Sequence, residues 1–349
     1  MTGFDIIEEV EERVILVGVS TGEGDDTAQS LDELEELAKT AGAVTVGRVI
    51  QNREQIHPGT YIGTGKIAEV QQLAYEVEAT GIICDDELTP AQLKNLEEEL
   101  DLKVMDRTLI ILDIFASRAS TSEGKIQVEL AQLKYRQARL VGLGSSLSRL
   151  GGGIGTRGPG EKKLEMDRRL IKSRIAQLNR ELDEVKRHRE VARSKRSRKS
   201  TAVIAIVGYT NAGKSTLLNT LTGAQVLEED KLFATLDPTT RILELPSGQE
   251  ILLTDTVGFI RKLPHHLIDA FRSTLEEAKY ADMILHVVDA SSPQMDQQMY
   301  VVYDTLKNLG VTDKKIVTLF NKQDKVEGGY LPRDLKAEKT VRISAKWGE

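Results

Sequence analysis

The chain has 349 residues, enough for two or three domains with separate hydrophobic cores. Apolar residues make up 40% of the sequence and charged residues 29%, an ordinary composition for a soluble protein. The sequence has no apolar run of about 18 residues and no signal-peptide pattern, which argues against membrane-spanning and secreted proteins. With Cys84 as its single cysteine, the chain has no internal disulfide. We expect a cytoplasmic, monomeric protein in which Cys84 is reduced and buried.

The net charge of −7 hides a strong asymmetry along the chain. Residues 1–40 contain twelve acidic and two basic residues, whereas residues 118–200 contain 22 Lys or Arg against nine Asp or Glu. The resulting net charge of +13 over residues 118–200 favours an anionic polymer as a partner. The alternative interpretation is a solvated helix surface.

In the N-terminal segment, residues 1–120, predicted strands alternate with predicted helices. Apolar runs predict strands at residues 14–19, 44–50, 82–84 and 103–105. Helical patterns occur at residues 31–38, 66–78 and 108–116, and Thr89 followed by Pro90 marks the start of another helix. This alternation indicates a small parallel α/β domain.

Within this segment, residues 59–67 imitate a phosphate-binding loop. Gly59 is one residue too far from Gly65, and Ile67 stands where a Ser or Thr would ligate magnesium. The favoured interpretation is a glycine-rich turn that caps a helix. A weak contact with a nucleotide or an RNA backbone is the alternative.

In residues 121–199, apolar side chains recur mostly at alternating steps of four and three. Two stripes follow this pattern, one with Ile126, Leu130, Leu133 and Leu140, the other with Ile171, Ile175, Leu178, Leu182 and Val185. Neither helix can bury its stripe alone, so the sequence predicts an antiparallel helical hairpin.

The segment between the two helices, residues 142–160, is predicted to be a loop because eight of its nineteen residues are glycine. It is either a slack connector or a mobile tip that orders against a ligand. Arg149 and Arg157 on glycine-rich backbone suit close approach to phosphates, which favours recognition. In residues 186–199, eight of fourteen are Lys or Arg, which indicates a solvated linker, an RNA contact or both.

The C-terminal segment, residues 200–349, carries a phosphate-binding loop after a predicted strand at 202–207. The loop fits the pattern of Gly, four residues, Gly-Lys-Ser, and consists of Gly208, Tyr209, Thr210, Asn211, Ala212, Gly213, Lys214 and Ser215. Its backbone N–H groups are expected to surround the β-phosphate, while Lys214 reaches the β- and γ-phosphates and Ser215 ligates Mg²⁺. Further strands are predicted at 251–253, 282–289 and 316–320, with a helix at 297–309. The prediction is a P-loop domain, a mostly parallel sheet flanked by helices.

Three further elements indicate which nucleotide binds. After strand 251–253 come Asp255, Thr256, Val257 and Gly258, where Asp255 can hold Mg²⁺ through water and the Gly258 N–H can contact the γ-phosphate. After strand 316–320 come Asn321, Lys322, Gln323 and Asp324, followed near the end of the chain by Ser344, Ala345 and Lys346. The Asp324 carboxylate can accept hydrogen bonds from N1 and the 2-amino group of guanine, and adenine lacks both donors. The elements together predict GTP rather than ATP.

Residues 233–241, the first switch segment, lie where a GTPase closes on Mg²⁺ and the γ-phosphate. The predicted nucleotide contacts here are Phe233, Ala234, Thr235, Leu236 and Asp237. A threonine hydroxyl has to ligate the ion, and the spacing leaves Thr235, Thr239 and Thr240 open. Phe259 follows Gly258, where many GTPases have a glutamine that orients water, so we expect hydrolysis to depend on a partner.

These features resemble the HflX family of ribosome-associated GTPases, in the translation-factor-related class. The resemblance uses the GTPase motifs, Phe259, the run Gly-Thr-Arg-Gly-Pro-Gly-Glu at 155–161 and the segment 164–169. Its most specific marks are the run 155–169, which leads into a basic helix, and the first switch segment. The resemblance covers essentially the whole chain. It implies that Thr235 is the Mg²⁺ ligand, that Lys214, Thr235 and Gly258 are catalytic, and that Asn211 is a candidate holder of K⁺.

The resemblance also implies binding to the large ribosomal subunit and its rRNA through the N-terminal and helical parts. GTP-bound protein would then separate the ribosomal subunits, in a stress-linked role. Lys162 and Lys163 replace uncharged polar residues of the family pattern and join Arg149 and Arg157 as predicted RNA contacts. Because the fold is expected to continue after Glu349, we expect a truncated C-terminus.

Other functions stay open at this stage. An RNA chaperone or ribosome-assembly factor would use GTP hydrolysis to time its release from precursor RNA. An RNA remodeller driven by a nucleotide at residues 59–67 is a further reading. A membrane-associated signalling GTPase is least favoured, because the sequence has no lipidation motif or amphipathic membrane helix.

Overall fold

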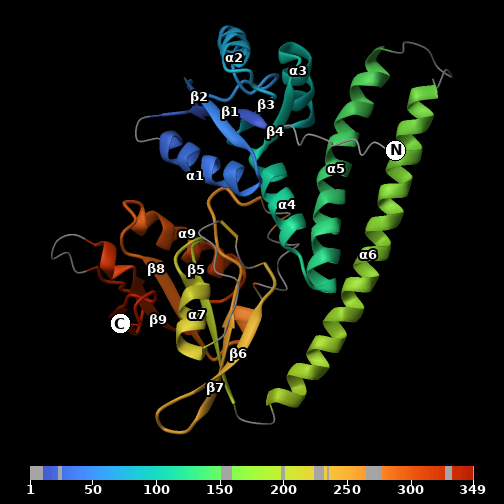
Figure 1. The fold of residues 1–349 in the computed structure, drawn as a ribbon. Coiled ribbons are helices and arrows are strands. Elements are labelled where there is room, and N and C mark those ends of the chain that lie inside the picture. Colours follow the sequence, from blue (N-terminus) through green and yellow to red (C-terminus); the bar gives the residue numbers. More distant parts are fainter. Residues whose placement is uncertain are drawn as a thin grey trace, which may run out of the picture. The chain divides into compact units, whose positions relative to one another are not determined.

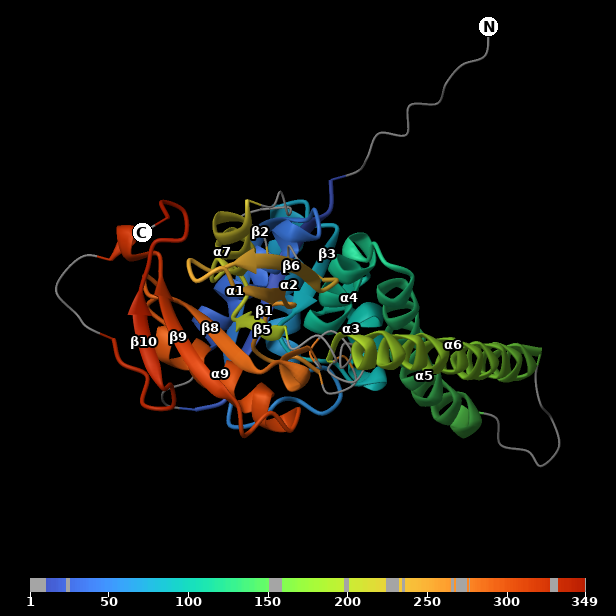
Figure 2. The same ribbon diagram turned by 90° about the horizontal axis from the view of Figure 1, so that it is seen from below.

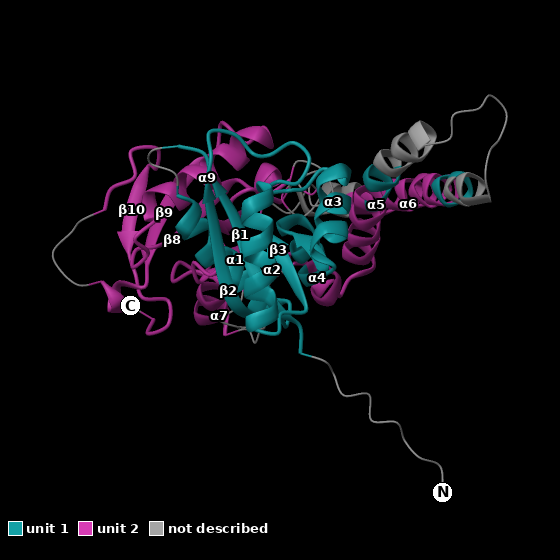
Figure 3. Cartoon of the chain, turned by 90° about the horizontal axis from the view of Figure 1, so that it is seen from above, with its two compact units in different colours: residues 1–114, 136–168 teal, residues 115–135, 169–349 magenta. Residues whose placement is uncertain are grey.

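The structure is a computed structural model that describes residues 11–22, 26–150, 159–197, 201–223, 232–233, 236–264, 267, 275, 277–326 and 332–348. Side chains are described over the same ranges except at 141–150, 159–164, 190 and 192–197. The chain forms two compact units (Figure 3). Unit 1 comprises Met1–Ile114 and Arg136–Arg168, and unit 2 comprises Phe115–Tyr135 and Arg169–Glu349.

Unit 1 contains a four-stranded sheet in the order β2-β1-β3-β4, in which every neighbouring pair is parallel. The strands are β1 (Arg13–Ser20), β2 (Val44–Asn52), β3 (Gly81–Cys84) and β4 (Lys103–Asp106). The strands are followed by the helices α1 (Thr27–Thr40), α2 (Thr64–Glu76), α3 (Pro90–Leu100) and α4 (Arg107–Arg118) (Figure 1). The predicted small parallel α/β domain is confirmed, with every predicted strand and helix present.

The core of unit 1 is built on β1, whose residues 14–17 are fully buried. A parallel strand that is covered on both faces has a continuous apolar run rather than an alternating one, which made this strand recognisable. The core continues through Ile82 and Cys84 of β3. Burial raises the pKa of the Cys84 thiol, so this free cysteine is the buried packing residue that the sequence indicates.

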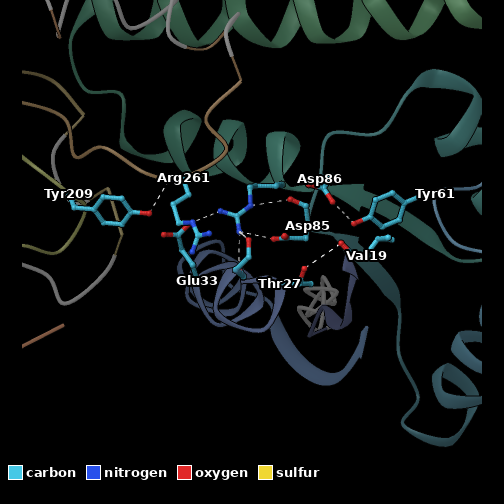
Figure 4. Close-up of polar contacts among 10 residues, drawn as sticks. Val19, Thr27, Glu33, Tyr61, Asp85, Asp86, Tyr209 and Arg261 are labelled. Atoms are coloured by element: carbon cyan, nitrogen blue, oxygen red, sulfur yellow. Dashed lines mark hydrogen bonds and ion pairs between the residues drawn. The ribbon is translucent and has the colours of Figure 1, made fainter. Parts of the chain in front are cut away.

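The segment 59–67 forms a turn that leads into α2, as the favoured interpretation predicts. Gly63 is the N-cap residue of α2, and its N–H donates to Gln51 Oε1 at 2.8 Å. Tyr61 is buried, and its hydroxyl donates to Asp86 Oδ2 at 2.7 Å (Figure 4). The turn is therefore held by its own side chains and by the neighbouring strand ends.

A buried ion pair fixes the carboxyl ends of β3 and β4. Arg107, only 1% exposed, donates to Asp85 Oδ1 at 2.7 Å and to Glu33 Oε1 at 2.6 Å (Figure 4). It also donates to the backbone oxygen of Ser30 at 2.9 Å. Burial alone lowers the pKa of an arginine, but the two carboxylates outweigh that effect and the pKa of Arg107 rises. The guanidinium therefore stays charged inside unit 1.

The predicted antiparallel hairpin is present as α5 (Ser122–Leu150) and α6 (Pro159–Ser197) (Figure 1). The seam is formed by Leu130, Leu178 and Leu182, with Ile126, Leu133 and Ile175 packed against them. Arg174 of α6 supports the seam, because its two nitrogens donate to the carboxylate of Glu129 at 2.7 and 2.9 Å. No described helix is long and apolar enough to cross a membrane.

The bounds predicted for the loop at 142–160 were wrong. Helix α5 continues to Leu150, and α6 already begins at Pro159. A glycine inside a helix costs only about 1 kcal/mol relative to alanine. The two glycines Gly142 and Gly144 are therefore not enough to end α5. Proline suits the first turn of a helix, where its missing N–H would have no partner. The run 151–158 lies outside the described residues.

The two compact units do not follow the three predicted segments 1–120, 121–199 and 200–349. Both helices of the hairpin contribute to both units, because residues 122–135 and 169–197 belong to unit 2 while 136–150 and 159–168 belong to unit 1. The base of the hairpin therefore forms one body with the C-terminal sheet. The three-segment boundaries stay a prediction.

Unit 2 contains a six-stranded sheet in the order β10-β9-β8-β5-β7-β6 (Figure 2). Only β6 is antiparallel to its neighbour. The strands are β5 (Ala202–Gly208), β6 (Thr239–Glu244), β7 (Glu250–Asp255), β8 (Met283–Asp289), β9 (Lys315–Asn321) and β10 (Lys339–Arg342). Beside the hairpin, the described helices of this unit include α7 (Lys214–Thr222), α9 (Met295–Asn308) and the short η1 (Gln323–Lys325). The predicted, mostly parallel P-loop sheet is confirmed.

The buried ion pair of unit 1 gives a stability prediction. We expect Arg107→Met to destabilise unit 1 by about 3–5 kcal/mol, because it leaves the Asp85 carboxylate buried without its cation. The measurement is urea-dependent hydrogen exchange of peptides from β1 and β3.

The matched control is Arg48→Met, since Arg48 pairs with Asp32 and Glu35 while 38% of its side chain is exposed. Screening by water should limit its effect to less than about 1 kcal/mol. Equal destabilisation by the two substitutions would contradict the prediction.

Candidate active site

The candidate loop leaves β5 at Gly208 and enters α7 at Lys214. Gly208 packs against the neighbouring strand so closely that a Cβ there would lie 2.2 Å from the Val287 oxygen. Gly213 has a φ of 95°, and a Cβ there would lie 2.3 Å from Asn321 Nδ2. The glycines at both ends of the pattern are thus required by close contacts with β8 and β9. The loop ends at the N-terminus of a helix, where anions are favoured.

Lys214, at the end of the phosphate loop and the start of α7, contacts the backbone of that loop. Its side chain is buried, and Nζ donates to the backbone oxygen of Tyr209 at 2.8 Å. Burial lowers the pKa of Lys214 to about 8, with the nearby charge of Lys322 acting in the same direction and that of Asp255 opposing it. A phosphate bound here would restore the preference for the charged form.

Ser215 and Asp255 meet at the carboxyl ends of β5 and β7. The Ser215 hydroxyl donates to Asp255 Oδ2 at 2.8 Å, and Asp255 is fully buried. A hydroxyl and a carboxylate are the oxygen ligands that Mg²⁺ prefers, so these residues fit a magnesium ion held by Ser215 and, through water, by Asp255. No group of three or more His, Cys, Asp or Glu among the described residues could hold a metal. Phosphate and water oxygens would therefore complete the coordination.

Gly258 lies directly against the loop. A Cβ at Gly258 would come within 2.8 Å of Thr210 Cγ2 and 3.1 Å of Lys214 Nζ. The preceding Thr256 is fixed to the central strand, because its hydroxyl donates to the Ile206 oxygen at 2.7 Å. The structure thus brings Gly258 beside the lysine with which it is predicted to share the γ-phosphate.

Phe259 continues this contact as a short strand pairing. The Thr210 N–H donates to the Phe259 oxygen at 2.8 Å, and the Phe259 N–H donates to the Gly208 oxygen at 3.1 Å. The Arg261 N–H also donates to the Tyr209 hydroxyl at 2.9 Å (Figure 4). The Phe259 ring is 2% exposed and so replaces the expected glutamine with a packed apolar group.

Asn321 joins the phosphate loop to the predicted guanine site. Its amide nitrogen donates to the Ala212 oxygen at 2.9 Å, and its amide oxygen accepts from the Ala345 N–H at 2.9 Å. The Ser344 hydroxyl donates to Asp324 Oδ1 at 2.6 Å, and this bond is the main reason why the pKa of Asp324 is lowered. The residue predicted to bind guanine is therefore an exposed, oriented carboxylate.

The remaining residues of the guanine elements lie around Asn321. Gln323 donates its N–H to the Ile343 oxygen at 3.2 Å, and the exposed Lys346 lies over the ring of Trp347. Lys322 Nζ pairs with Asp289 Oδ2 at 2.7 Å. Sequence reasoning missed Asp289, although its place at the carboxyl end of the apolar strand β8 was a usable signal.

The first switch segment is described in part, since Ala234 and Thr235 lie outside the described residues. Phe233 and Leu236 are buried. The Asp237 carboxylate accepts hydrogen bonds from Ser120 and Thr121, before α5. The sequence held no signal for this pairing because the partners are more than a hundred residues apart.

The two other threonine candidates for the Mg²⁺ ligand lie on β6. The Thr240 hydroxyl is 2.9 Å from the Thr254 hydroxyl across the sheet, and Thr239 is paired in register with Asp255. The assignment of the magnesium ligand to Thr235 stays a prediction. The predicted RNA contacts also stay predictions, because Arg157 and the side chains of Arg149, Lys162 and Lys163 lie outside the described residues.

Comparison with known proteins identifies the family. Residues 28–116 match the family "GTP-binding GTPase N-terminal", residues 118–196 match "GTP-binding GTPase Middle Region", and residues 203–322 match "50S ribosome-binding GTPase". The GTPase HflX of Lacrimispora saccharolytica is 71% identical over 349 residues, which cover 100% of this chain and 82% of that protein. The chain belongs to the HflX family of GTPases.

Solved structures agree with this assignment. A structure of SsGBP in complex with GDP has a TM-score of 0.53 at 27% identity and covers 95% of this chain and 93% of its own. A GTP-binding protein from Sulfolobus solfataricus, also with GDP, has a TM-score of 0.50 at 26% identity with the same coverage. This HflX-family protein is therefore a GTPase with a P-loop domain.

The lowered pKa of Lys214 predicts a pH dependence of GTP binding. Since phosphates favour the charged lysine, binding at about pH 8.5 should take up most of one proton, and GTP affinity should fall as the pH rises above about 8. Calorimetry in buffers of different ionisation enthalpy measures the uptake. The control is Lys214→Arg, whose guanidinium stays charged and should take up no proton. Equal uptake by both proteins would rule the prediction out.

The oriented carboxylate of Asp324 predicts base selectivity. Asp324→Asn should weaken GTP binding at least about tenfold, because an amide offers one acceptor where guanine presents two donors. Xanthosine triphosphate, whose position 2 carries an acceptor, should bind better to the variant than to the parent. Fluorescent-nucleotide competition measures both, with the exposed Asp296→Asn as the control. Unchanged selectivity would remove Asp324 from the guanine site.

Proposed function

We propose that this HflX-family GTPase binds the large ribosomal subunit in its GTP state and separates the ribosomal subunits, in a stress-linked role in the cytoplasm. The observation that carries the proposal is which segments of the chain make up unit 2. The nucleotide site and the base of the basic hairpin belong to this one compact body. A change at the nucleotide can therefore reach an RNA-binding element without crossing a domain boundary.

The charge of the hairpin supports rRNA as the partner. Residues 118–200 contain 22 Lys or Arg against nine Asp or Glu. On the described part of α6, the exposed basic side chains include Arg169, Lys172, Arg180 and Arg187. Such side chains suit contacts with a phosphate backbone, which would make binding fall steeply with salt. In this proposal Arg149, Arg157, Lys162 and Lys163 extend the same surface.

The family descriptions also support a ribosomal partner. The family that matches residues 203–322 is described as a 50S ribosome-binding GTPase. In the proposed site, Ser215 and Thr235 ligate Mg²⁺, Asp255 acts through water, and Lys214 and Gly258 contact the γ-phosphate. K⁺, held with Asn211, is proposed as a second cation on the family resemblance. Since Phe259 cannot orient water, the ribosomal partner is expected to complete the site.

The test is GTP turnover with and without purified large ribosomal subunits, in KCl and in NaCl. We expect the subunits to stimulate turnover at least about tenfold, as partners that complete a GTPase site do. Lys214→Ala should abolish turnover. Replacing Arg149 and Arg157 by Gln should weaken the stimulation and leave basal turnover unchanged. The matched control neutralises two exposed lysines outside the hairpin, Lys307 and Lys339.

Sedimentation of mature ribosomes tests the separation step. With a non-hydrolysable GTP analogue, the protein should convert mature ribosomes into free subunits. Retained binding to precursor particles without separation of mature ribosomes would instead support an assembly factor or RNA chaperone timed by GTP hydrolysis. Absence of stimulation and of separation would refute the ribosomal proposal.

A further inference from the structure

One carboxylate of the first switch segment, that of Asp237, is hydrogen-bonded to the residues just before α5. Asp237 Oδ2 accepts the Ser120 N–H at 2.9 Å, the Ser120 hydroxyl at 2.7 Å and the Thr121 N–H at 2.9 Å. Asp237 Oδ1 accepts the Thr121 hydroxyl at 2.5 Å. All of these atoms belong to unit 2. Four donors thus converge on a single side chain.

The four donors belong to the N-terminal end of α5. The Thr121 hydroxyl also accepts the Gly124 N–H at 2.9 Å, and the Thr121 oxygen accepts the Lys125 N–H at 3.0 Å, which starts the helix. A carboxylate at this end of a helix faces its positive dipole. These hydrogen bonds lower the pKa of Asp237 although its partial burial would raise it. Asp237 therefore extends the cap that Thr121 begins.

The fit between Asp237 and α5 is tight. A Cβ added at Gly124 would lie 2.4 Å from Asp237 Oδ1 and 3.2 Å from the Thr121 hydroxyl. Gly124 lies inside α5, where alanine is ordinarily the better helix former. The absence of a side chain at 124 is explained by the room that the Asp237 carboxylate needs.

A second contact holds the other end of the described switch segment. The Phe233 ring packs against Phe115 with ring centroids 4.6 Å apart and planes at 70°. Both rings are buried, and Phe115 lies on α4 shortly before α5 begins. In the sequence, the predicted Mg²⁺ ligand Thr235 therefore lies between two residues, Phe233 and Asp237, that contact residues 115–121.

The base of the hairpin is also linked to Glu277, which precedes β8 in the chain. Arg189 of α6 forms an ion pair with Glu123 in the first turn of α5. The other guanidinium nitrogen of Arg189 lies 3.9 Å from Glu277 Oε1. The start of α5 thus contacts Asp237 directly and is linked to Glu277 through Arg189.

We propose that Asp237 is a positioning residue that clamps the first switch segment to the N-terminus of α5, so that the hairpin responds to the bound nucleotide. Asp237 acts through Ser120 and Thr121 and does not touch the nucleotide. A shift of Asp237 between the nucleotide states pulls on the first turn of α5 or releases it. The proposal rests on GTP binding by unit 2 and does not require a ribosome, so it can fail or stand independently of the proposed function.

The carboxylate is the part of Asp237 that the clamp needs. Its two oxygens take four donors, two N–H groups and two hydroxyls. An asparagine at 237 would present one oxygen and one NH₂ group, and that NH₂ could pair only with the Thr121 hydroxyl, in the reversed direction. Asp237→Asn is therefore nearly unchanged in shape, but it loses the negative charge and weakens the clamp.

Hydrogen exchange of the complete chain tests the clamp on the amides of residues 118–128. Exchange is compared for nucleotide-free protein, the GDP complex and the complex with guanosine 5′-(β,γ-imido)triphosphate. In the parent protein we expect these amides to differ between the two nucleotides by at least about threefold in rate, since exchange reports local opening. In Asp237→Asn they should exchange faster and show no such difference.

Two further variants distinguish loss of the clamp from a change in helix stability and from the loss of a negative charge. Gly124→Ala favours the helix but blocks the carboxylate, so it should also remove the nucleotide dependence of the 118–128 amides. Asp313→Asn, at an exposed position of unit 2, should behave like the parent. GTP affinity, measured with a fluorescent nucleotide, should stay within about threefold of the parent in Gly124→Ala and Asp313→Asn, whose positions lie outside the predicted nucleotide contacts.

Three results would overturn the proposal. The first is a parent protein whose 118–128 amides exchange equally with both nucleotides. The second is a nucleotide dependence that persists in Asp237→Asn and in Gly124→Ala. The third is a loss of GTP affinity of more than about tenfold in Asp237→Asn without a change in α5, which would make Asp237 a nucleotide ligand instead.

Discussion

The parallel strands β5, β7, β8 and β9 end at one edge of the unit 2 sheet, and the nucleotide site depends on this alignment. The phosphate loop follows β5, Asp255 ends β7, Asp289 ends β8 and Asn321 ends β9. Asn321 then ties these ends together, because its amide bonds to both Ala212 and Ala345. The motifs are far apart in the sequence, but they lie close together in the structure because they follow the ends of neighbouring strands.

Within this frame, polar side chains of the site have partners inside the protein. Lys214 donates to the oxygen of its own loop, Ser215 donates to Asp255, and Lys322 pairs with Asp289. Burial lowers the pKa of Lys214, so a bound phosphate would favour its charged form. The backbone of Phe259 is paired with the phosphate loop.

The structure also shows to which unit the base of the helical hairpin belongs. The sequence predicted the leucine seam of the hairpin, but it did not predict that residues 122–135 and 169–197 belong to unit 2. The base of the hairpin meets the first switch segment at Asp237 and contacts Glu277 through Arg189. The base of the hairpin is therefore part of the GTPase unit.

The sequence by itself determined the elements whose signal is local. The phosphate loop, the buried strands and the leucine stripes each depend on short-range spacing, and the family resemblance rests on similar short runs. Three-dimensional contacts decided the rest. Helix α5 continues through Gly142 because two isolated glycines do not outweigh a helical context, and the Asp237 carboxylate accepts hydrogen bonds from residues 120 and 121. Hydrogen bonds between residues so far apart depend on how the chain is folded, and no local pattern encodes them.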